Sequence, residues 1–184
     1  MRKNPFPTMG RVRFLTPRIG WFFDATGGFG VAPGQTYSYV TQNGGKTWAQ
    51  GNLPVPHALR MKGQSVPYVR VWSPSRMVVA LLYAPGHLVI NHSTDAGRTW
   101  TASPAMTVRG AGLPVLSFIN PADGWLWTNG ALYHTTDGGG HWTLVNRGLK
   151  RVQQIQYLNP SVGFMLASGR VLVTNDGGST WRGA

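Results

Sequence analysis

The amino-acid sequence predicts an all-β protein, and more narrowly a β-propeller of four blades with about four antiparallel strands each. An eight-residue pattern occurs four times, a segment with an aromatic residue two or three positions before a Pro precedes each copy, and the repeats follow one another along nearly the whole chain. Repeats of about 40 residues with short strands are typical of propeller blades. Gly and Pro are abundant and apolar residues make up 42%, which suits short strands joined by turns.

The whole chain, 1–184, has the length of a single domain. We therefore expect one propeller whose blades occupy residues 11–50, 66–103, 115–146 and 151–184, with connections at 51–65 and 104–114. Four blades can close as a small ring, associate with a second copy, or form part of a larger propeller.

The eight-residue pattern, called the octet below, occupies residues 41–48, 93–100, 135–142 and 174–181. Asp or Asn at its third place can accept hydrogen bonds from backbone N–H groups one or two residues ahead, and Gly at its fifth place tolerates left-handed backbone. Trp at its eighth place opens the outgoing strand with a large apolar surface. Each octet is thus a hairpin turn, and its structural residues are Asn43, Gly45 and Trp48; Asp95, Gly97 and Trp100; Asp137, Gly139 and Trp142; and Asp176, Gly178 and Trp181.

In the first repeat, Val12 and Phe14 alternate with Arg11 and Arg13, which is the period of a strand. Further strands are expected at 20–24 and 37–40, on either side of a Gly-rich loop at 25–34. In the second repeat, 78–83 and 87–91 are apolar enough to be strands. The third repeat shows the complete blade, with strands at 115–120, 124–128, 131–135 and 141–145 and the octet turn between the last two.

The octets, together with the segments before them, resemble the Asp-box, or bacterial neuraminidase repeat, of sialidases, sortilin-type receptors and photosystem II assembly factors. Those segments begin at Phe14, Trp72, Phe118 and Tyr157, and three of them continue as Gly followed by an aromatic residue. The paired pattern is most similar to the assembly-factor branch. This resemblance implies a non-catalytic scaffold that binds a protein, and it favours a secreted or cell-envelope protein.

The chain carries 17 basic and 5 acidic residues, a formal net charge of +12. This charge favours anionic partners or surfaces. The candidate binding residues are the closest groups of cations, namely Arg11 and Arg13, and Arg147, Lys150 and Arg151; Arg60 and Lys62 form a further pair. A nucleic-acid interface is an alternative, but the cations are scattered and match no nucleic-acid motif.

Sialidase chemistry is not expected. The chain contains no Glu, and Arg18 is followed by Ile-Gly where sialidases have Arg-Ile-Pro. Three aspartates belong to octets, and Asp123 lies in a turn whose backbone it should cap. Asp24 alone is left, whereas glycosidases commonly need two carboxylates. No catalytic residue is assigned, although a carbohydrate-active or carbohydrate-binding module is the main alternative, with the octet tryptophans as stacking platforms.

No cofactor or metal site is expected either. Cysteine is absent, and among the five histidines His87 and His92 would point to opposite faces of one strand. The first residues are basic without the apolar run of a signal peptide, and no stretch approaches the roughly 20 apolar residues of a membrane span. The sequence therefore predicts a soluble binding protein.

Overall fold

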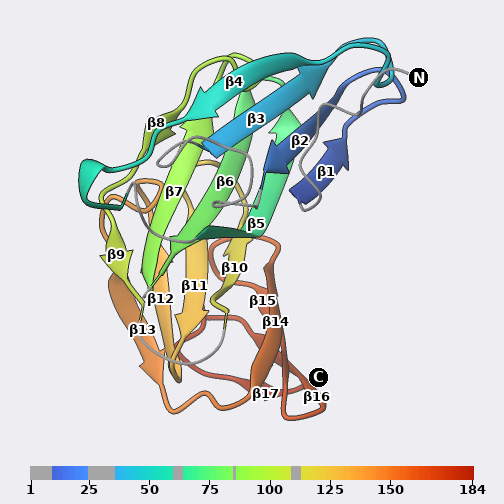
Figure 1. The fold of residues 1–184 in the computed structure, drawn as a ribbon. Coiled ribbons are helices and arrows are strands. Elements are labelled where there is room, and N and C mark those ends of the chain that lie inside the picture. Colours follow the sequence, from blue (N-terminus) through green and yellow to red (C-terminus); the bar gives the residue numbers. More distant parts are fainter. Residues whose placement is uncertain (1–9, 25–35, 60–63, 85, 109–112) are drawn as a thin grey trace. The chain divides into compact units, whose positions relative to one another are not determined.

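The computed structural model describes residues 10–24, 36–59, 64–84, 86–108 and 113–184. Within these residues the chain forms antiparallel β-sheets and one short 3-10 helix, with no α-helix (Figure 1). The predicted all-β fold of four propeller-type blades is confirmed. Contacts divide the chain into two compact units, Met1–Ala105 and Met106–Ala184.

The first unit holds two blades. Strands of the first blade lie in the order β1–β2–β3–β4, and those of the second in the order β5–β6–β7–β8. Their bounds are β1 Gly10–Phe14, β2 Gly20–Asp24, β3 Thr36–Thr41, β4 Ala49–Leu53, β5 Gln64–Ser73, β6 Arg76–Tyr83, β7 His87–Ser93 and β8 Thr101–Ala102, with the 3-10 helix His57–Leu59 between β4 and β5.

The second unit begins with a short strand, β9 (Met106–Thr107), and then holds two further blades. Their strand orders are β10–β11–β12–β13 and β14–β15–β16–β17. The bounds are β10 Val115–Phe118, β11 Gly124–Thr128, β12 Ala131–Thr135, β13 Thr143–Arg147, β14 Val152–Tyr157, β15 Gly163–Ala167, β16 Arg170–Thr174 and β17 Arg182–Gly183. In every blade the octet turn joins the third strand to the fourth.

The connection between the first two blades differs from the expected one. β4 runs to Leu53 and β5 begins at Gln64, so the connection between them is shorter than the expected 51–65. β4 was predicted only in part, because it is mostly exposed and polar and therefore lacks the apolar alternation of a strand. The Gly-rich loop at 25–34 and the pair Arg60 and Lys62 lie outside the described residues.

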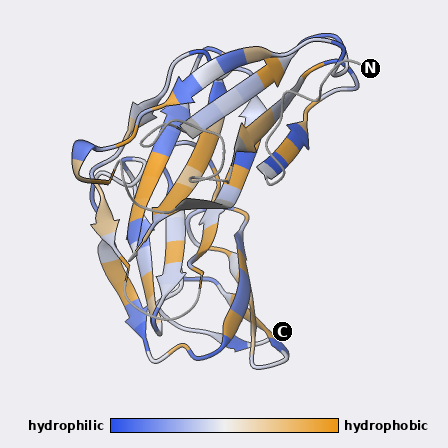
Figure 2. Ribbon diagram, viewed as in Figure 1, coloured by the Kyte–Doolittle hydropathy of each residue, from blue (hydrophilic) through white to orange (hydrophobic). Residues whose placement is uncertain are grey.

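The core of each unit consists of aromatic and aliphatic side chains from the inner strands. In the first unit the core includes Trp21, Phe23 and a run on β6, where every residue from Met77 to Leu81 is buried. A strand buried on both faces can be apolar at every position, and Figure 2 shows β6 as largely hydrophobic. In the second unit Trp125 and Tyr157 lie at the centre of the core.

Packing between strands explains the Gly-aromatic segments. Phe14, Phe118 and Tyr157 each pair in register with a glycine, respectively Gly20, Gly124 and Gly163. A Cβ on any of these glycines would collide with the paired ring. In the second blade Val71 pairs with Met77, and without a ring no glycine is required.

Within each unit the earlier blade packs one face on the later blade, and the contact is the same in both. Trp21 Nε1 donates to the carbonyl of Ala96 (2.8 Å), and Trp125 Nε1 donates to that of Gly177 (3.1 Å). Ala96 and Gly177 occupy the fourth place of their octets. We call the face that carries Trp21 or Trp125 the forward face of a blade, the opposite face the backward face, and the contact a seam.

Candidate functional site

The octets form tight turns held by their own side chains. The third-place side chain accepts a hydrogen bond from the backbone N–H four residues ahead, as Asn43 does from Thr47 and Asp95 from Thr99, both at 2.9 Å. Asp137 and Asp176 accept equivalent bonds. The expected span of one or two residues was wrong, because two successive residues with positive φ intervene, at the fourth and fifth places.

The first-place hydroxyl completes the turn from its buried position at the end of the third strand. Thr174 Oγ1 donates to Asp176 Oδ1 (2.7 Å) and accepts from the N–H of Gly178 (2.9 Å), and the other octets repeat both bonds. The sequence placed this residue in a strand without assigning it a bond. The first-place hydroxyl and the third-place side chain of each octet are thus hydrogen-bonded within the turn.

The octet tryptophans are half-buried and are also engaged locally. The indole Nε1 of Trp48, Trp100 and Trp181 donates to the carbonyl of the fifth-place glycine, at 3.1, 3.0 and 2.9 Å. Trp142 packs edge-on against Phe118, with centroids 6.3 Å apart. These contacts orient each ring against its own blade, which is the geometry of a packing residue rather than of an exposed stacking platform.

Asp123 does not cap its turn, contrary to the sequence prediction. Asn120 takes that role, because its Oδ1 accepts from the N–H groups of Ala122 and Asp123 (both 2.9 Å). The Asp123 carboxylate instead forms a hydrogen bond with His134 Nε2 (2.6 Å). His134 stacks on Trp125, with ring centroids 4.3 Å apart. The histidine and the aspartate therefore support the core of the second unit.

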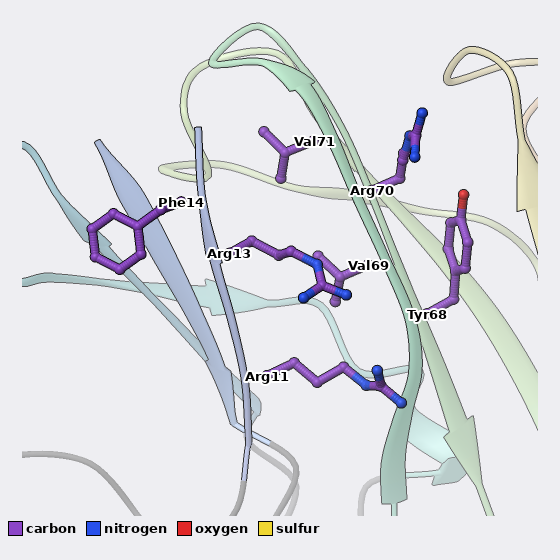
Figure 3. A pocket seen from close by; sticks show the side chains of 7 residues that line it. All are labelled: Arg11, Arg13, Phe14, Tyr68, Val69, Arg70 and Val71. Atoms are coloured by element: carbon purple, nitrogen blue, oxygen red, sulfur yellow. The ribbon is translucent and has the colours of Figure 1, made fainter. Parts of the chain in front are cut away.

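A cleft lies between β1 and β5 in the first unit (Figure 3). It has a volume of about 300 Å³ and is lined by Arg11, Arg13, Phe14, Tyr68, Val69, Arg70 and Val71. Arg11 and Arg13 extend from β1 toward β5, and Val69 and Val71 extend from β5 toward β1. The cleft thus brings together two arginines predicted as binding residues, and it adds a third, Arg70, that sequence reasoning missed.

One substitution between the repeats accounts for the cleft. In the second unit the backbone N–H of Tyr157 donates to Ser117 Oγ (3.0 Å), which joins the inner strands β14 and β10 directly. Ser117 is in register with Trp125, and the equivalent residue in the first blade, in register with Trp21, is Arg13. A long charged side chain cannot be buried there without a partner. It occupies the space between the strands, and the guanidinium lies beside its own backbone, with Nη1 donating to the Val12 carbonyl (3.2 Å).

Arg70 lies on the other face of β5 from the two valines, together with Tyr68. Its guanidinium carbon is 5.7 Å from the ring centroid of Trp72, which is a cation–π distance. The described residues that line the cleft include no acidic side chain. The site is therefore cationic along one wall and the rim, and apolar along the other wall.

The remaining predicted cations lie in the second unit. Arg147 ends β13, and Lys150 and Arg151 lie in the exposed connection to β14. Hydrogen bonds hold this connection against two hairpin turns, since Gly148 N–H donates to Gly130 and Ser168 N–H donates to Arg151. The three cations are thus grouped where β13 leads into β14.

Within the described ranges, no group of three or more His, Asp or Glu side chains is arranged to hold a metal ion. Over the same residues, no helix has the length and apolar character needed to cross a membrane.

No protein-family model matches the chain, and no curated protein matches it in sequence. Among solved structures it is similar to YCF48 from Cyanidioschyzon merolae, with 17% identity and a TM-score of 0.58 over 98% of this chain and 57% of that one. Two others are YCF48 bound to D1 peptide (16%, TM-score 0.48, 99% and 72%) and the GH74 enzyme of Niastella koreensis (16%, 0.42, 91% and 39%).

At this level of identity the likeness concerns the fold alone. The chain spans little more than half of the Cyanidioschyzon merolae protein. Together with the four antiparallel sheets, the comparison identifies a fold of β-propeller blades shared with YCF48.

Proposed function

We propose that this protein is a non-catalytic binding module, of the photosystem II assembly-factor type that its repeats resemble, and that the β1–β5 cleft takes an anionic segment of a protein partner. The observation that carries the proposal is the cleft itself, in which Arg11 and Arg13 face an apolar wall of Val69 and Val71 and Arg70 lies on the other face of β5. Guanidinium groups recognise carboxylates through paired N–H donors.

The mixed lining favours a peptide over a nucleic acid. An extended peptide alternates its side chains, so that acidic residues can reach the arginines while apolar residues meet the valines. Nucleic-acid interfaces instead rely on many cations that follow a phosphate backbone. The cleft is lined by three described cations, and these lie on a short length of two strands rather than along an extended track.

Binding rather than chemistry is also supported by the state of the acidic residues. Asp95, Asp137 and Asp176 are held in octet turns and Asp123 is paired with His134. No Glu occurs in the chain. A pair of carboxylates for glycoside hydrolysis is therefore not assembled from these four side chains.

The test compares two triple variants that remove the same charge. R11Q/R13Q/R70Q alters the cleft, and R147Q/K150Q/R151Q alters the loops of the second unit. The probe is a fluorescent peptide of alternating Glu and Leu, with the Gln and Leu version as the uncharged control. We expect the cleft variant to weaken binding of the acidic peptide by about thirtyfold, roughly 2 kcal/mol, and the loop variant by only a few-fold.

Equal weakening by the two variants would show that net charge, not the cleft, attracts the peptide, and would overturn the assignment. Duplex DNA and sialyllactose serve as competitors. Displacement of the peptide by DNA at lower concentration than by unlabelled peptide, with a steeper salt dependence, would favour the nucleic-acid alternative. Displacement by the glycan would favour the carbohydrate alternative.

A further inference from the structure

Places that are buried at the seam of the second unit are exposed on the backward face of the first blade. Phe14 is 49% exposed, whereas Tyr157, at the same place in the fourth blade, is 5% exposed. Val12 is 51% exposed, whereas Ile155 at the corresponding place is 4% exposed. The first blade therefore presents to solvent the surface with which the fourth blade packs on the third.

The forward face of the fourth blade shows the complementary exposure. Phe164 is 37% exposed, although Trp21 and Trp125 at the same place are 0% exposed. Val171 is 53% exposed, whereas Leu132 at the corresponding place is 0% exposed. The fourth blade therefore exposes the same surface that the first blade packs on the second and that the third blade packs on the fourth.

Each seam is built from such a pair of surfaces. In the second unit Trp125 stacks on Tyr157, with centroids 3.7 Å apart and planes at 6°, and both donate to the Gly177 carbonyl at 3.1 Å. In the first unit Trp21 reaches Ala96, and Trp100 Nε1 bonds Ser38 Oγ (3.2 Å) across the seam. The contact is head-to-tail, because a forward face always meets a backward face.

We propose that the forward face of the fourth blade docks on the backward face of the first blade in a second copy of this chain. Phe164 and Val171 would then lie against Phe14 and Val12 in the way that Trp125 and Leu132 lie against the fourth blade. Two chains contribute eight blades, which is within the range of closed propellers. A head-to-tail contact repeated in both directions closes a pair of chains.

The chemistry of the two faces suits a second copy. Both faces expose apolar side chains at the places named, and the exposed neighbours on β14 are the uncharged Gln154 and Gln156. Arg11 and Arg13 lie on the opposite face of β1, toward β5. Arg182 on the outer strand β17 is in register with Val173 and so lies on the forward face of the fourth blade, whereas the inner strands β14 and β15 contain no cation. In a chain with a formal charge of +12, the inner strands are therefore the part of this face on which two copies meet with least repulsion.

The seam between copies should be weaker than those inside the chain. Phe164 has no N–H to donate to the first octet's fourth-place carbonyl, at Gly44, and Phe14 lacks the hydroxyl that Tyr157 uses. Replacing Phe164 by Trp restores the residue found at both internal seams. We expect F164W to tighten self-association by about tenfold, through the added hydrogen bond and ring area.

The experiment is sedimentation equilibrium of the full chain over a range of concentrations. We expect the wild type to associate reversibly, F14D and F164D each to remain monomeric, and an equimolar mixture of F14D and F164D to regain dimers. In a mixed dimer, the intact Phe164 face of the F14D chain meets the intact Phe14 face of the F164D chain. The other seam contains both aspartates, so a single seam is restored. L158D, which charges an exposed turn residue outside both faces, should associate as the wild type does.

Circular dichroism checks that the variants are folded, and F164W tests the seam without adding a charge. A wild type that stays monomeric at every concentration, with F164W also monomeric, would overturn the proposal. So would dimers of F14D or of F164D as stable as those of the wild type, because one of the two proposed faces would then lie outside the contact.

Discussion

The third residue of the octet shows how little of this turn depends on charge. In the first octet Asn43 replaces the aspartate of the other three, and its Oδ1 accepts from Thr47 N–H at the same 2.9 Å seen in the second and fourth octets. Its Nδ2 donates to Thr47 Oγ1 (2.7 Å), whereas Asp176 accepts from Thr180 Oγ1 (2.6 Å). The threonine hydroxyl simply reverses its role. An amide therefore builds the same turn, and the carboxylate adds only a dependence on pH.

This comparison predicts that Asp176→Asn will be nearly as stable as the wild type at neutral pH and less sensitive to acid. Hydrogen bonds from the Thr180 side chain, and then from its backbone, lower the pKa of Asp176 below its usual 3.8. A carboxyl whose pKa is lowered by folding stabilises the folded state above its unfolded pKa, and the contribution is lost as pH falls below about 4. Urea unfolding at neutral pH and near pH 3 measures the difference. D176A, which lacks both acceptors, should be less stable at both.

Glycine at the fifth place is required for two separate reasons at Gly178. Its φ is +101°, and a Cβ would collide with Leu132 and with the Tyr157 hydroxyl across the seam. Gly169 has φ +75° with no atom within 4 Å of a Cβ, so that it isolates the backbone effect. We expect G169A to cost about 1 kcal/mol and G178A about 3 kcal/mol in unfolding free energy. Equal losses by thermal or urea unfolding would show that the seam tolerates the methyl group.

At the scale of the element, the seam in the second unit concentrates several interactions on one carbonyl. Trp125 Nε1 and Tyr157 Oη both donate to Gly177 O, and Trp125 also stacks between Tyr157 and His134. Burial raises the pKa of the Tyr157 hydroxyl, and the nearby Asp176 raises it further. The tyrosine therefore remains a neutral donor at ordinary pH.

A double-mutant cycle on this seam should be non-additive. Y157F removes one donor and leaves the other, so we expect a loss of about 1 kcal/mol in unfolding free energy. W125F removes the second donor and part of the stacked ring. The double variant leaves Gly177 O without either donor, and we expect it to lose about 1 kcal/mol more than the sum of the single losses. Additive losses in urea unfolding would mean that water replaces the missing donors.

The sequence predicted those strands and turns whose formation depends on a single local pattern, either the alternation of apolar residues or the octet. The alternation of Arg11 to Phe14 and the third repeat fulfil that condition, and their strands are confirmed. β4 was predicted only in part because its polar residues at 49–52 carry no periodic signal. The role of Asp123 could not be read from its turn, since His134 reaches it from the neighbouring strand.

The cleft was predictable only in part for the same reason. Arg11 and Arg13 were chosen as a close pair, and the structure places both in the cleft. Arg70 is isolated in the sequence from other cations, and only the packing of β5 beside β1 brings it to the site. One signal was present, because Arg70 alternates with Val69 and Val71 as Arg11 and Arg13 alternate with Val12. Alternating Arg and Val residues on two neighbouring inner strands therefore indicate a site in which arginines lie next to apolar side chains.

At the scale of the molecule, the excess of positive charge has few internal counterions. The chain holds 5 acidic residues against 17 basic ones. Four of the aspartates are engaged in hydrogen bonds with Ser, Thr or His side chains, three of them within octets. The cations therefore act outward, both as a long-range field and through the local geometry of the cleft.

These two effects can be separated by kinetics. Long-range attraction governs how fast an anionic peptide arrives, whereas close contacts govern how long it stays. The cleft and loop triple variants each remove three of the cations that make up the formal charge of +12. We expect both to slow association with the Glu–Leu peptide by a similar few-fold factor at low ionic strength, and this difference from the wild type to shrink at high salt.

The dissociation rates should divide the two variants. R11Q/R13Q/R70Q removes guanidinium groups that line the cleft, and we expect the peptide to leave about tenfold faster. R147Q/K150Q/R151Q alters only exposed loop residues of the second unit, so that its dissociation rate should equal that of the wild type. Stopped-flow fluorescence at two salt concentrations measures both rates. Faster dissociation from the loop variant alone would place the peptide on the loops of the second unit, and unchanged dissociation from both would reduce the cleft to one part of a diffuse basic surface.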